Sequence, residues 1–398
     1  MSLNDSPKFE LFRLDTLLKL ALLFFLFVSI VLGNKTPHIS ILGLRESQWM
    51  MLALLPVTLY LLFLRKMYKD AVVQILFIFV LFGLFSAYRA YLDLVPVKFL
   101  LASSGLYLYP LFFLMSLVAF EKKDVALVFN VILTSTIIGI IFFVGYYYLE
   151  NKQLPFLFRT SSDILPVLAA GLASSILYSL RFNGFKYLFI LLPLIFFSYL
   201  MLVKGAILAV LATFFFIIFR RYLIISLLAS LFFTGLVLWF FYLKVDVLVN
   251  YANQGDIFWY NIVTRLLVWE DYFLHLYSSP KYFIFGTGLE PFFSEIIYEN
   301  IFLSLFSDCN GVIHHNPHNS YLLMAHYSGF LSLIVFLFVI FRVFSLSTLK
   351  IDKQLALILP ITLFFLMLAM TTPVFELHYI APIFWLLLGL FYRYRKLN

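Results

Sequence analysis

Apolar runs of membrane-spanning length recur along the whole chain. Interpreted as helices, they predict twelve spans, near residues 17–33, 49–64, 71–88, 99–120, 125–148, 165–180, 187–203, 205–219, 222–243, 319–341, 354–371 and 377–392. A helix needs about 20 apolar residues to cross a hydrocarbon core about 30 Å thick. The pattern therefore predicts an all-α, polytopic membrane protein with about 12 transmembrane helices.

The apolar stretch 187–219 must be divided to fit this scheme. It is 33 residues long and carries Lys204 near its middle. A single helix of that length would extend about 50 Å, which exceeds the hydrocarbon thickness. Two short helices joined by a tight outer turn at Lys204-Gly205 fit better.

One long polar segment interrupts the hydrophobic pattern. It covers 244–318, about 75 residues, which is short for an independent domain. We expect it to form partly amphipathic helices on the outer face of the membrane. The chain then divides into nine transmembrane helices over 1–243, the large loop with short helices over 244–317, and three transmembrane helices over 318–398.

Composition and charge support a membrane location. Hydrophobic residues make up 64% of the chain and charged residues 12%, whereas soluble proteins are about 45–50% apolar and about a quarter charged. With both termini in the cytoplasm, 17 of the 28 basic residues lie inside and ten outside, and Lys19 lies within the first span. This bias follows the positive-inside rule. It explains the net charge of +8 without nucleic acid as a partner.

Several familiar motifs are absent from the sequence. There is no P-loop, no H-E-x-x-H, no C-x-x-C pair and no D-x-D pair, so neither a nucleotide site of familiar type nor a cofactor is expected. Gly286-Thr287-Gly288 is interpreted as a turn rather than a dinucleotide loop. The single Cys309 excludes an internal disulfide framework.

The segment 314–320, with the sequence HHNPHNS, contains the densest group of candidate functional residues. Its proline and the apolar run that follows place His318 and Asn319 at the outer N-terminus of a spanning helix. Free N–H groups there favour an anion, and a histidine there can act as a general base. The alternative is an interfacial polar cap without chemistry, which we favour for the two earlier histidines. Zinc is disfavoured because Pro317 interrupts the helix that would align the ligands.

Three cations are candidate anion ligands: Arg265, Lys204 and Arg159. Each has a plainer alternative, namely a surface salt bridge for Arg265, a snorkelling lysine and an ordinary loop arginine. In the assigned topology all three share the outer side with His318. Together they could hold a diphosphate and leave the histidine to act on an incoming hydroxyl.

The order of these motifs resembles the O-antigen ligase and polymerase superfamily. The family's His-Asn-x-x-Leu…Gly signature is similar to His318, Asn319, Leu322 and Gly329. Its Arg…Trp…Pro-(apolar)-Gly-x-Gly run is similar to Arg265, Trp269, Pro280, Gly286 and Gly288. The motifs cover about 265–330, and the hydropathy profile matches over the rest of the chain.

The resemblance implies a fold related to lipid-sugar transferases of the GT-C type and an active site facing the periplasm. The donor would be a glycan on undecaprenyl diphosphate. The family's catalytic histidine corresponds to His318. Its diphosphate ligands correspond to Arg265, Lys204 and Arg159, and its supporting residues to Asn319, Trp269, Gly286 and Gly288. Lys204 stands where the family commonly has arginine, so it keeps the charge but loses the bidentate fork.

The expected activity is an inverting, metal-independent glycosyl transfer in the bacterial inner membrane. The protein most resembles an O-antigen ligase, whose acceptor is lipid A-core. The alternative is a repeat-unit polymerase, whose acceptor is another lipid-linked glycan, and no residue separates the two. A transporter is less favoured, because most charges lie at span ends rather than in mid-membrane.

Overall fold

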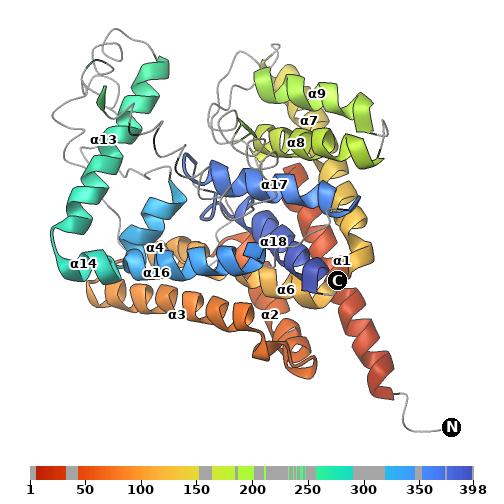
Figure 1. The fold of residues 1–398 in the computed structure, drawn as a ribbon, viewed down its shortest axis with the longest axis horizontal. Coiled ribbons are helices and arrows are strands. Elements are labelled where there is room, and N and C mark those ends of the chain that lie inside the picture. The colour runs from red at the N-terminus through yellow and green to blue at the C-terminus, as the bar shows by residue number, and fades with distance from the viewer. Residues whose placement is uncertain are drawn as a thin grey trace.

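The computed structural model describes residues 6–32, 44–151, 164–183, 187–200, 257–289, 319–345, 352–372 and 374–396, with isolated positions between 210 and 247. Within these ranges the chain is all-helical and has no strand (Figure 1). The longer helices are α1 (Ser6–Leu32), α2 (Glu46–Leu64), α3 (Ala71–Leu92), α6 (Leu111–Ala119), α7 (Val125–Asn151), α8 (Ile164–Asn183), α9 (Leu188–Leu200), α13 (Ile257–Tyr277), α16 (Ser320–Ser345), α17 (Leu355–Leu368) and α18 (Ala381–Lys396). The short helices are α4 (Val97–Ser103), α5 (Gly105–Leu108), α14 (Pro280–Phe285) and the 3-10 turns η1 (Met67–Lys69) and η2 (Lys122–Asp124).

Ten of the twelve predicted spans coincide with a helix or helix group, and the spans 205–219 and 222–243 fall almost entirely outside the described residues. Five described helices are long and apolar enough to cross a membrane: Leu14–Leu32, Glu46–Leu64, Ala71–Leu92, Lys122–Gly145 and Ser320–Phe344. A bent pair, Val97–Leu108 and Leu111–Ala119, would be a sixth. The chain is therefore an all-helical protein with five or six membrane-capable helices in the part described.

The predicted span 99–120 is not a single straight helix. It is divided into α4, α5 and α6, and its two halves meet at 45°. Pro110 lies at the break, where its ring blocks the backbone hydrogen bond that a continuous helix requires. The periodicity of the apolar residues does not register this break, because both halves are equally hydrophobic.

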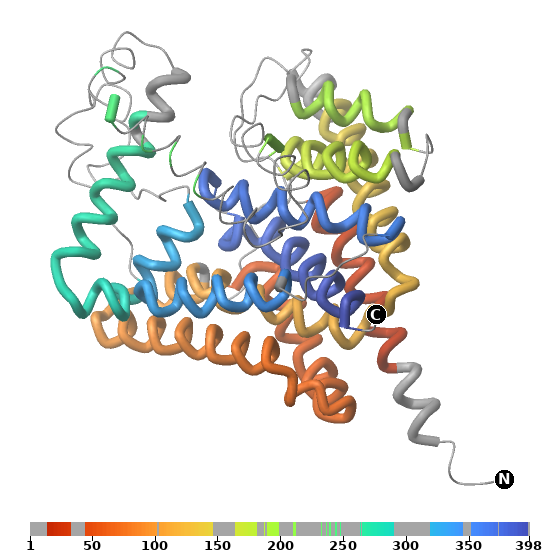
Figure 2. Tube along the Cα trace, viewed as in Figure 1, coloured from red at the N-terminus to blue at the C-terminus, as the bar shows by residue number. Residues whose placement is uncertain are grey.

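Helices α17 and α18 form the centre of the molecule (Figure 2). Every residue of α17 is buried, and α18 is buried except at Arg393 and Lys396. Gly389 lets α18 approach α6 closely, since a Cβ there would overlap Ser116 Oγ and lie 2.5 Å from Phe113 O. The peripheral helices instead expose large apolar side chains such as Phe24 and Leu81, as lipid contact requires.

The two ends of the bundle differ in chemistry. At one end, here called the ion-pair end, side chains from α1 and η2, from the ends of α2 and α18 and from the residues just before α3 and α17 form ion pairs. The pairs are Lys19–Asp124, Arg65–Asp15, Lys122–Asp352 and Lys396–Asp70. At the opposite end, here called the site end, α1, α3 and α17 finish and α2, α16 and α18 begin.

Within the predicted loop 244–317, the structure describes α13, α14 and the turn that follows them. Figure 1 shows α13 standing along one side of the bundle, with α14 at its foot beside α3 and α16. Ser279 begins α14 by accepting a hydrogen bond from Lys281 N, and Pro280 occupies the first turn. These helices carry Arg265 and the Gly-x-Gly turn to the site end.

Candidate functional site

The N-terminus of α16 is capped by Asn319. Its Oδ1 atom accepts hydrogen bonds from Tyr321 N and Leu322 N, both at 3.1 Å. An amide cap of this kind satisfies N–H groups that a helix start leaves free. His318, the residue directly before this cap, lies outside the described residues, as do Lys204 and Arg159.

The loop between α17 and α18 closes over the first turn of α16. Ser320 N donates to Ala369 O at 2.9 Å. Ser320 Oγ accepts from Phe375 N at 3.1 Å and donates to Glu376 Oε2 at 2.6 Å. The start of α16 is therefore fixed to residues 369–376 by backbone and side-chain contacts.

Glu376 is an unusual carboxyl group. The residue is partly exposed, yet its Oε1 atom is buried and has no hydrogen-bond partner among the residues described. Burial raises the pKa of Glu376 to about 7, although the Ser320 hydrogen bond opposes this shift. Near neutral pH this group can therefore either hold a proton or accept one, next to Ser320 at the start of α16.

Arg265 reaches the same loop from α13. Its Nη1 atom donates to Thr371 O at 3.1 Å. It forms no ion pair with any residue in the described ranges, so the predicted alternative of a surface salt bridge has no counterpart there. Burial lowers the pKa of Arg265 from its usual value. An arginine stays charged in proteins, and an uncompensated cation in a poorly solvated position favours a bound anion.

The loop 369–376 thus brings two predicted groups together. Arg265 contacts it at Thr371, and the cap that follows His318 contacts it at Ala369 and Phe375–Glu376. Trp269, one helical turn beyond Arg265, is buried in the core and helps hold α13. The described part of the site therefore combines a cation, a helix N-terminus and a titratable carboxyl group.

The Gly286-Thr287-Gly288 turn packs directly on α16. Thr287 N donates to His326 O at 2.8 Å and Gly288 N donates to Tyr327 O at 3.1 Å. Both glycines have positive φ, at +69° and +103°. A Cβ on Gly286 would lie 2.5 Å from His326 O, so only glycine permits this approach.

Gly329 completes the same junction from the other side. Its φ of +77° interrupts α16, and a Cβ there would overlap the backbone of Ile284. The segments 284–288 and 326–329, which are about 40 residues apart in the sequence, therefore meet backbone to backbone. Arg89 of α3 donates to Phe285 O at 2.9 Å and Gly286 O at 2.8 Å, which ties the junction to α3.

Sequence reasoning missed two polar residues of this region, Glu376 and His326. His326 is 1% exposed, and its Nε2 atom lies 3.1 Å from Thr287 Oγ1. The sequence could have pointed to both residues, because each is a polar residue among apolar ones. Glu376 is the single acidic residue between 354 and 392, and His326 lies inside an apolar run. Polar residues at such positions are costly and point to a structural or functional role.

An apolar cavity of about 220 Å³ begins at Asn319. It lies between α13, α16 and the end of α17, and Asn319 is the strongly polar residue among the described residues that line it. The remaining lining residues are Phe273, Tyr321, Leu322, Ala325, Phe330, Leu333, Leu337 and Met370. The cavity therefore follows α16 away from the cap, and its shape and chemistry suit a hydrocarbon chain.

The chemistry available is that of anion binding and proton transfer. In the described ranges, no group of three or more histidine, cysteine or acidic residues could hold a metal ion. No protein-family model matches the sequence, and no curated protein matches it. Arg265 can bind an anion, the dipole at the α16 N-terminus favours negative charge nearby, and Glu376 can take up or release a proton.

Replacing Glu376 with glutamine should change how stability depends on pH. The folded pKa of about 7 exceeds the usual value of 4.5, so the folded protein binds this proton more tightly than the unfolded chain. The associated stability is present below about pH 4.5 and is lost as pH rises towards 7, by about 3 kcal/mol. We expect the melting temperature of Glu376→Gln, relative to the wild type, to rise across this interval. A difference that stays constant between pH 4 and pH 8 would contradict the assignment.

Proposed function

We propose that this protein is a membrane glycosyltransferase that moves a glycan from undecaprenyl diphosphate to an acceptor hydroxyl at the periplasmic face. The observation that carries the proposal is Arg265. It is a poorly solvated cation without an ion pair among the described residues, and it is held by the loop that also fixes the α16 N-terminus. A diphosphate would supply the missing negative charge.

In this proposal three residues bind the diphosphate and a fourth accepts a proton. Arg265, Lys204 and Arg159 bind the diphosphate, and the dipole of α16 adds to the positive field at its N-terminus. His318 accepts the proton of the acceptor hydroxyl, whose oxygen attacks the anomeric carbon. The bond to the diphosphate oxygen breaks, and undecaprenyl diphosphate leaves. Direct attack inverts the configuration, and no step requires a nucleotide or a metal ion.

The apolar cavity beside Asn319 supports a lipid-linked donor. A polyprenyl chain lying in it would place its diphosphate near the cap of α16, since the cavity begins there. The exposed side of α13 near the cavity is also apolar, with Phe273 42% and Leu274 58% exposed. Such a surface fits contact with membrane lipid or with the rest of a long polyprenyl chain.

The proposal also includes the membrane topology. The protein would have about twelve transmembrane helices in a fold related to GT-C lipid-sugar transferases, in the bacterial inner membrane. The ion-pair end would face the cytoplasm, because Lys19, Arg65, Lys122 and Lys396 lie there. The site end, with Arg265 and the α16 N-terminus, would then face the periplasm.

A reconstituted assay tests the activity. Purified protein in liposomes receives a labelled glycan on undecaprenyl diphosphate, with either lipid A-core or a second lipid-linked glycan as acceptor. Transfer to lipid A-core supports the ligase that we favour, and chain extension supports a polymerase. Movement of the donor across the bilayer without any product would contradict the proposal and support a carrier.

Replacing Arg265 with alanine should lower kcat/KM for the donor about 100-fold, because a charge-assisted contact to the diphosphate is lost. Arg265→Lys should recover part of this loss, since it restores the charge but not the fork. Lys281→Ala is the matched control, because it removes an exposed cation from the neighbouring helix α14. An unchanged donor KM and kcat in Arg265→Ala would remove Arg265 from the site.

A further inference from the structure

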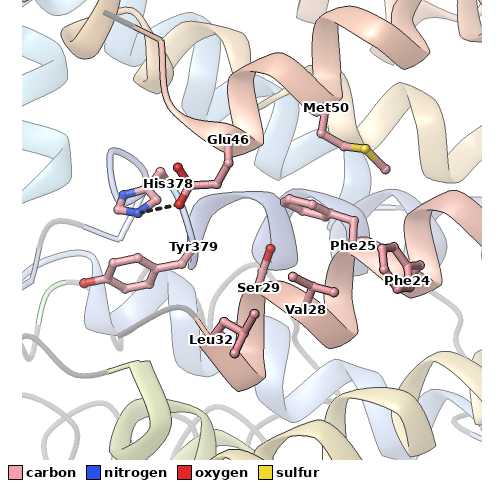
Figure 3. A pocket seen from close by; sticks show the side chains of 9 residues that line it. All are labelled: Phe24, Phe25, Val28, Ser29, Leu32, Glu46, Met50, His378 and Tyr379. Atoms are coloured by element: carbon pink, nitrogen blue, oxygen red, sulfur yellow. Dashed lines mark ion pairs between the residues drawn. The ribbon is translucent and has the colours of Figure 1, made fainter. Parts of the chain in front are cut away.

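A second cavity, of about 200 Å³, lies between α1 and α2 at the site end. Figure 3 shows its wall. Phe24, Phe25, Val28 and Leu32 of α1 line one side, Met50 of α2 lines another, and Glu46 and His378 stand at one end. Phe24 is 68% and Leu32 46% exposed. Because α1 is a membrane-capable helix, this apolar wall opens towards lipid.

The polar end of the cavity is organised by a buried histidine. His378 is 3% exposed, and its Nδ1 atom lies 2.5 Å from Arg45 Nη1. A guanidinium group can only donate, so Nδ1 must be the acceptor. The ring proton is then on Nε2, which lies 3.5 Å from Glu46 Oε1. His378 thereby orients the carboxylate of Glu46, and the side chain of Glu46 is 45% exposed.

The charges at this end restrict what the cavity can bind. Arg45 keeps its positive charge, but it donates to His378 and does not line the cavity, so the charged group presented at the end of the cavity is the Glu46 carboxylate. A carboxylate only accepts hydrogen bonds, so it favours hydroxyl donors and repels a phosphate. The hydroxyl-bearing residues Ser29 and Tyr379 complete the polar lining.

The cavity also adjoins the candidate active site. His378 lies two residues after Glu376, on the loop that holds Ser320 and Arg265. A molecule with its tail in the apolar part and its head at Glu46 would therefore lie next to the loop that contacts Ser320 and Arg265.

We propose that the cavity between α1 and α2 binds an amphiphile with a neutral, hydroxyl-rich headgroup, which Glu46 recognises through hydrogen bonds. This binding does not rest on the proposed function. The apolar wall takes the acyl or alkyl chain, and His378 keeps the carboxylate in place. The bound headgroup lies at the site end of the bundle.

Photolabelling tests this binding without any transfer activity. The full-length protein in phosphatidylcholine nanodiscs is treated with an alkyl β-glucoside that carries a diazirine in its chain, and labelled peptides are identified by mass spectrometry. We expect saturable labelling within 24–32 and 46–50. Excess octyl β-glucoside should suppress it at least fivefold, and octyl phosphate should not. Label spread evenly over the lipid-facing helices would overturn the proposal.

Two variants and a control sharpen the test. Met50→Trp should fill the cavity and reduce labelling at least fivefold, and Glu46→Gln should reduce it severalfold by removing the charge. Leu20→Trp is the control, because it places the same bulk on an exposed position of α1 outside the cavity. Labelling of Met50→Trp at the control level would refute the site.

The charge of the headgroup is tested separately. Competition by octylammonium that exceeds competition by octyl β-glucoside would replace the neutral headgroup with a cationic one and overturn that part of the proposal.

Discussion

Glycan transfer is expected to stop when His318 is replaced by alanine, with the protein still inserted in the membrane. The acceptor hydroxyl is a poor nucleophile until its proton is removed, and a positioned base contributes about 10²–10⁴-fold to the rate. His318 directly precedes Asn319, whose side chain caps α16. The substitution should therefore remove the base without removing the cap that starts the helix.

The measurement is single-turnover transfer from the labelled lipid-linked donor. His315→Ala is the matched control, because it removes a histidine of the same segment for which we predict no chemistry. Membrane insertion and melting temperature should be unchanged in both variants. Transfer at the wild-type rate by His318→Ala would refute its role, whatever the behaviour of the control.

Replacing Gly329 with alanine is expected to disrupt the junction between α14 and α16. The residue has φ of +77°, and its Cβ would overlap the carbonyl of Ile284. The left-handed backbone alone costs a non-glycine residue about 1–2 kcal/mol. The overlap adds to this because a backbone carbonyl cannot rotate aside as a side chain can, so we expect a loss of several kcal/mol.

The expected readout is a melting temperature in detergent that falls by about 10 °C. Gly145→Ala on α7 provides the comparison, since no atom lies within 4 Å of the Cβ that it would add. Its melting temperature should stay within experimental error of the wild type or rise slightly. Equal melting temperatures for the two alanine variants would contradict the proposed packing at Gly329.

The helix positions were predictable because lipid-facing and buried helices both require long apolar runs. The apolar pattern could not predict the break at Pro110 or the bend at Gly329. Each depends on local backbone geometry inside a run that is hydrophobic on both sides. Arg265 could be named as a candidate anion ligand from its residue type and its place in the order of motifs. Its contact with Thr371 depends on tertiary packing, which the sequence pattern does not show.

Glu376 and His378 show the limit of sequence reasoning most clearly. Both stand in a short connection between two apolar helices, where a polar residue commonly faces water. The structure instead buries Glu376 Oε1 and leaves His378 3% exposed. That burial is produced by helices distant in sequence: α16 covers Glu376 through Ser320, and α2 covers His378 through Arg45 and Glu46.

The burial of α17 and α18 on all sides has an evolutionary consequence. The loop that touches Arg265, Ser320 and Arg45 is the link between these two helices. Their packing therefore helps to set the spacing of the side chains that contact this loop. Sequence drift at the exposed apolar positions of α3, such as Leu81, should therefore be tolerated, whereas a volume change near Gly389 should disturb the loop even though it lies on a different helix.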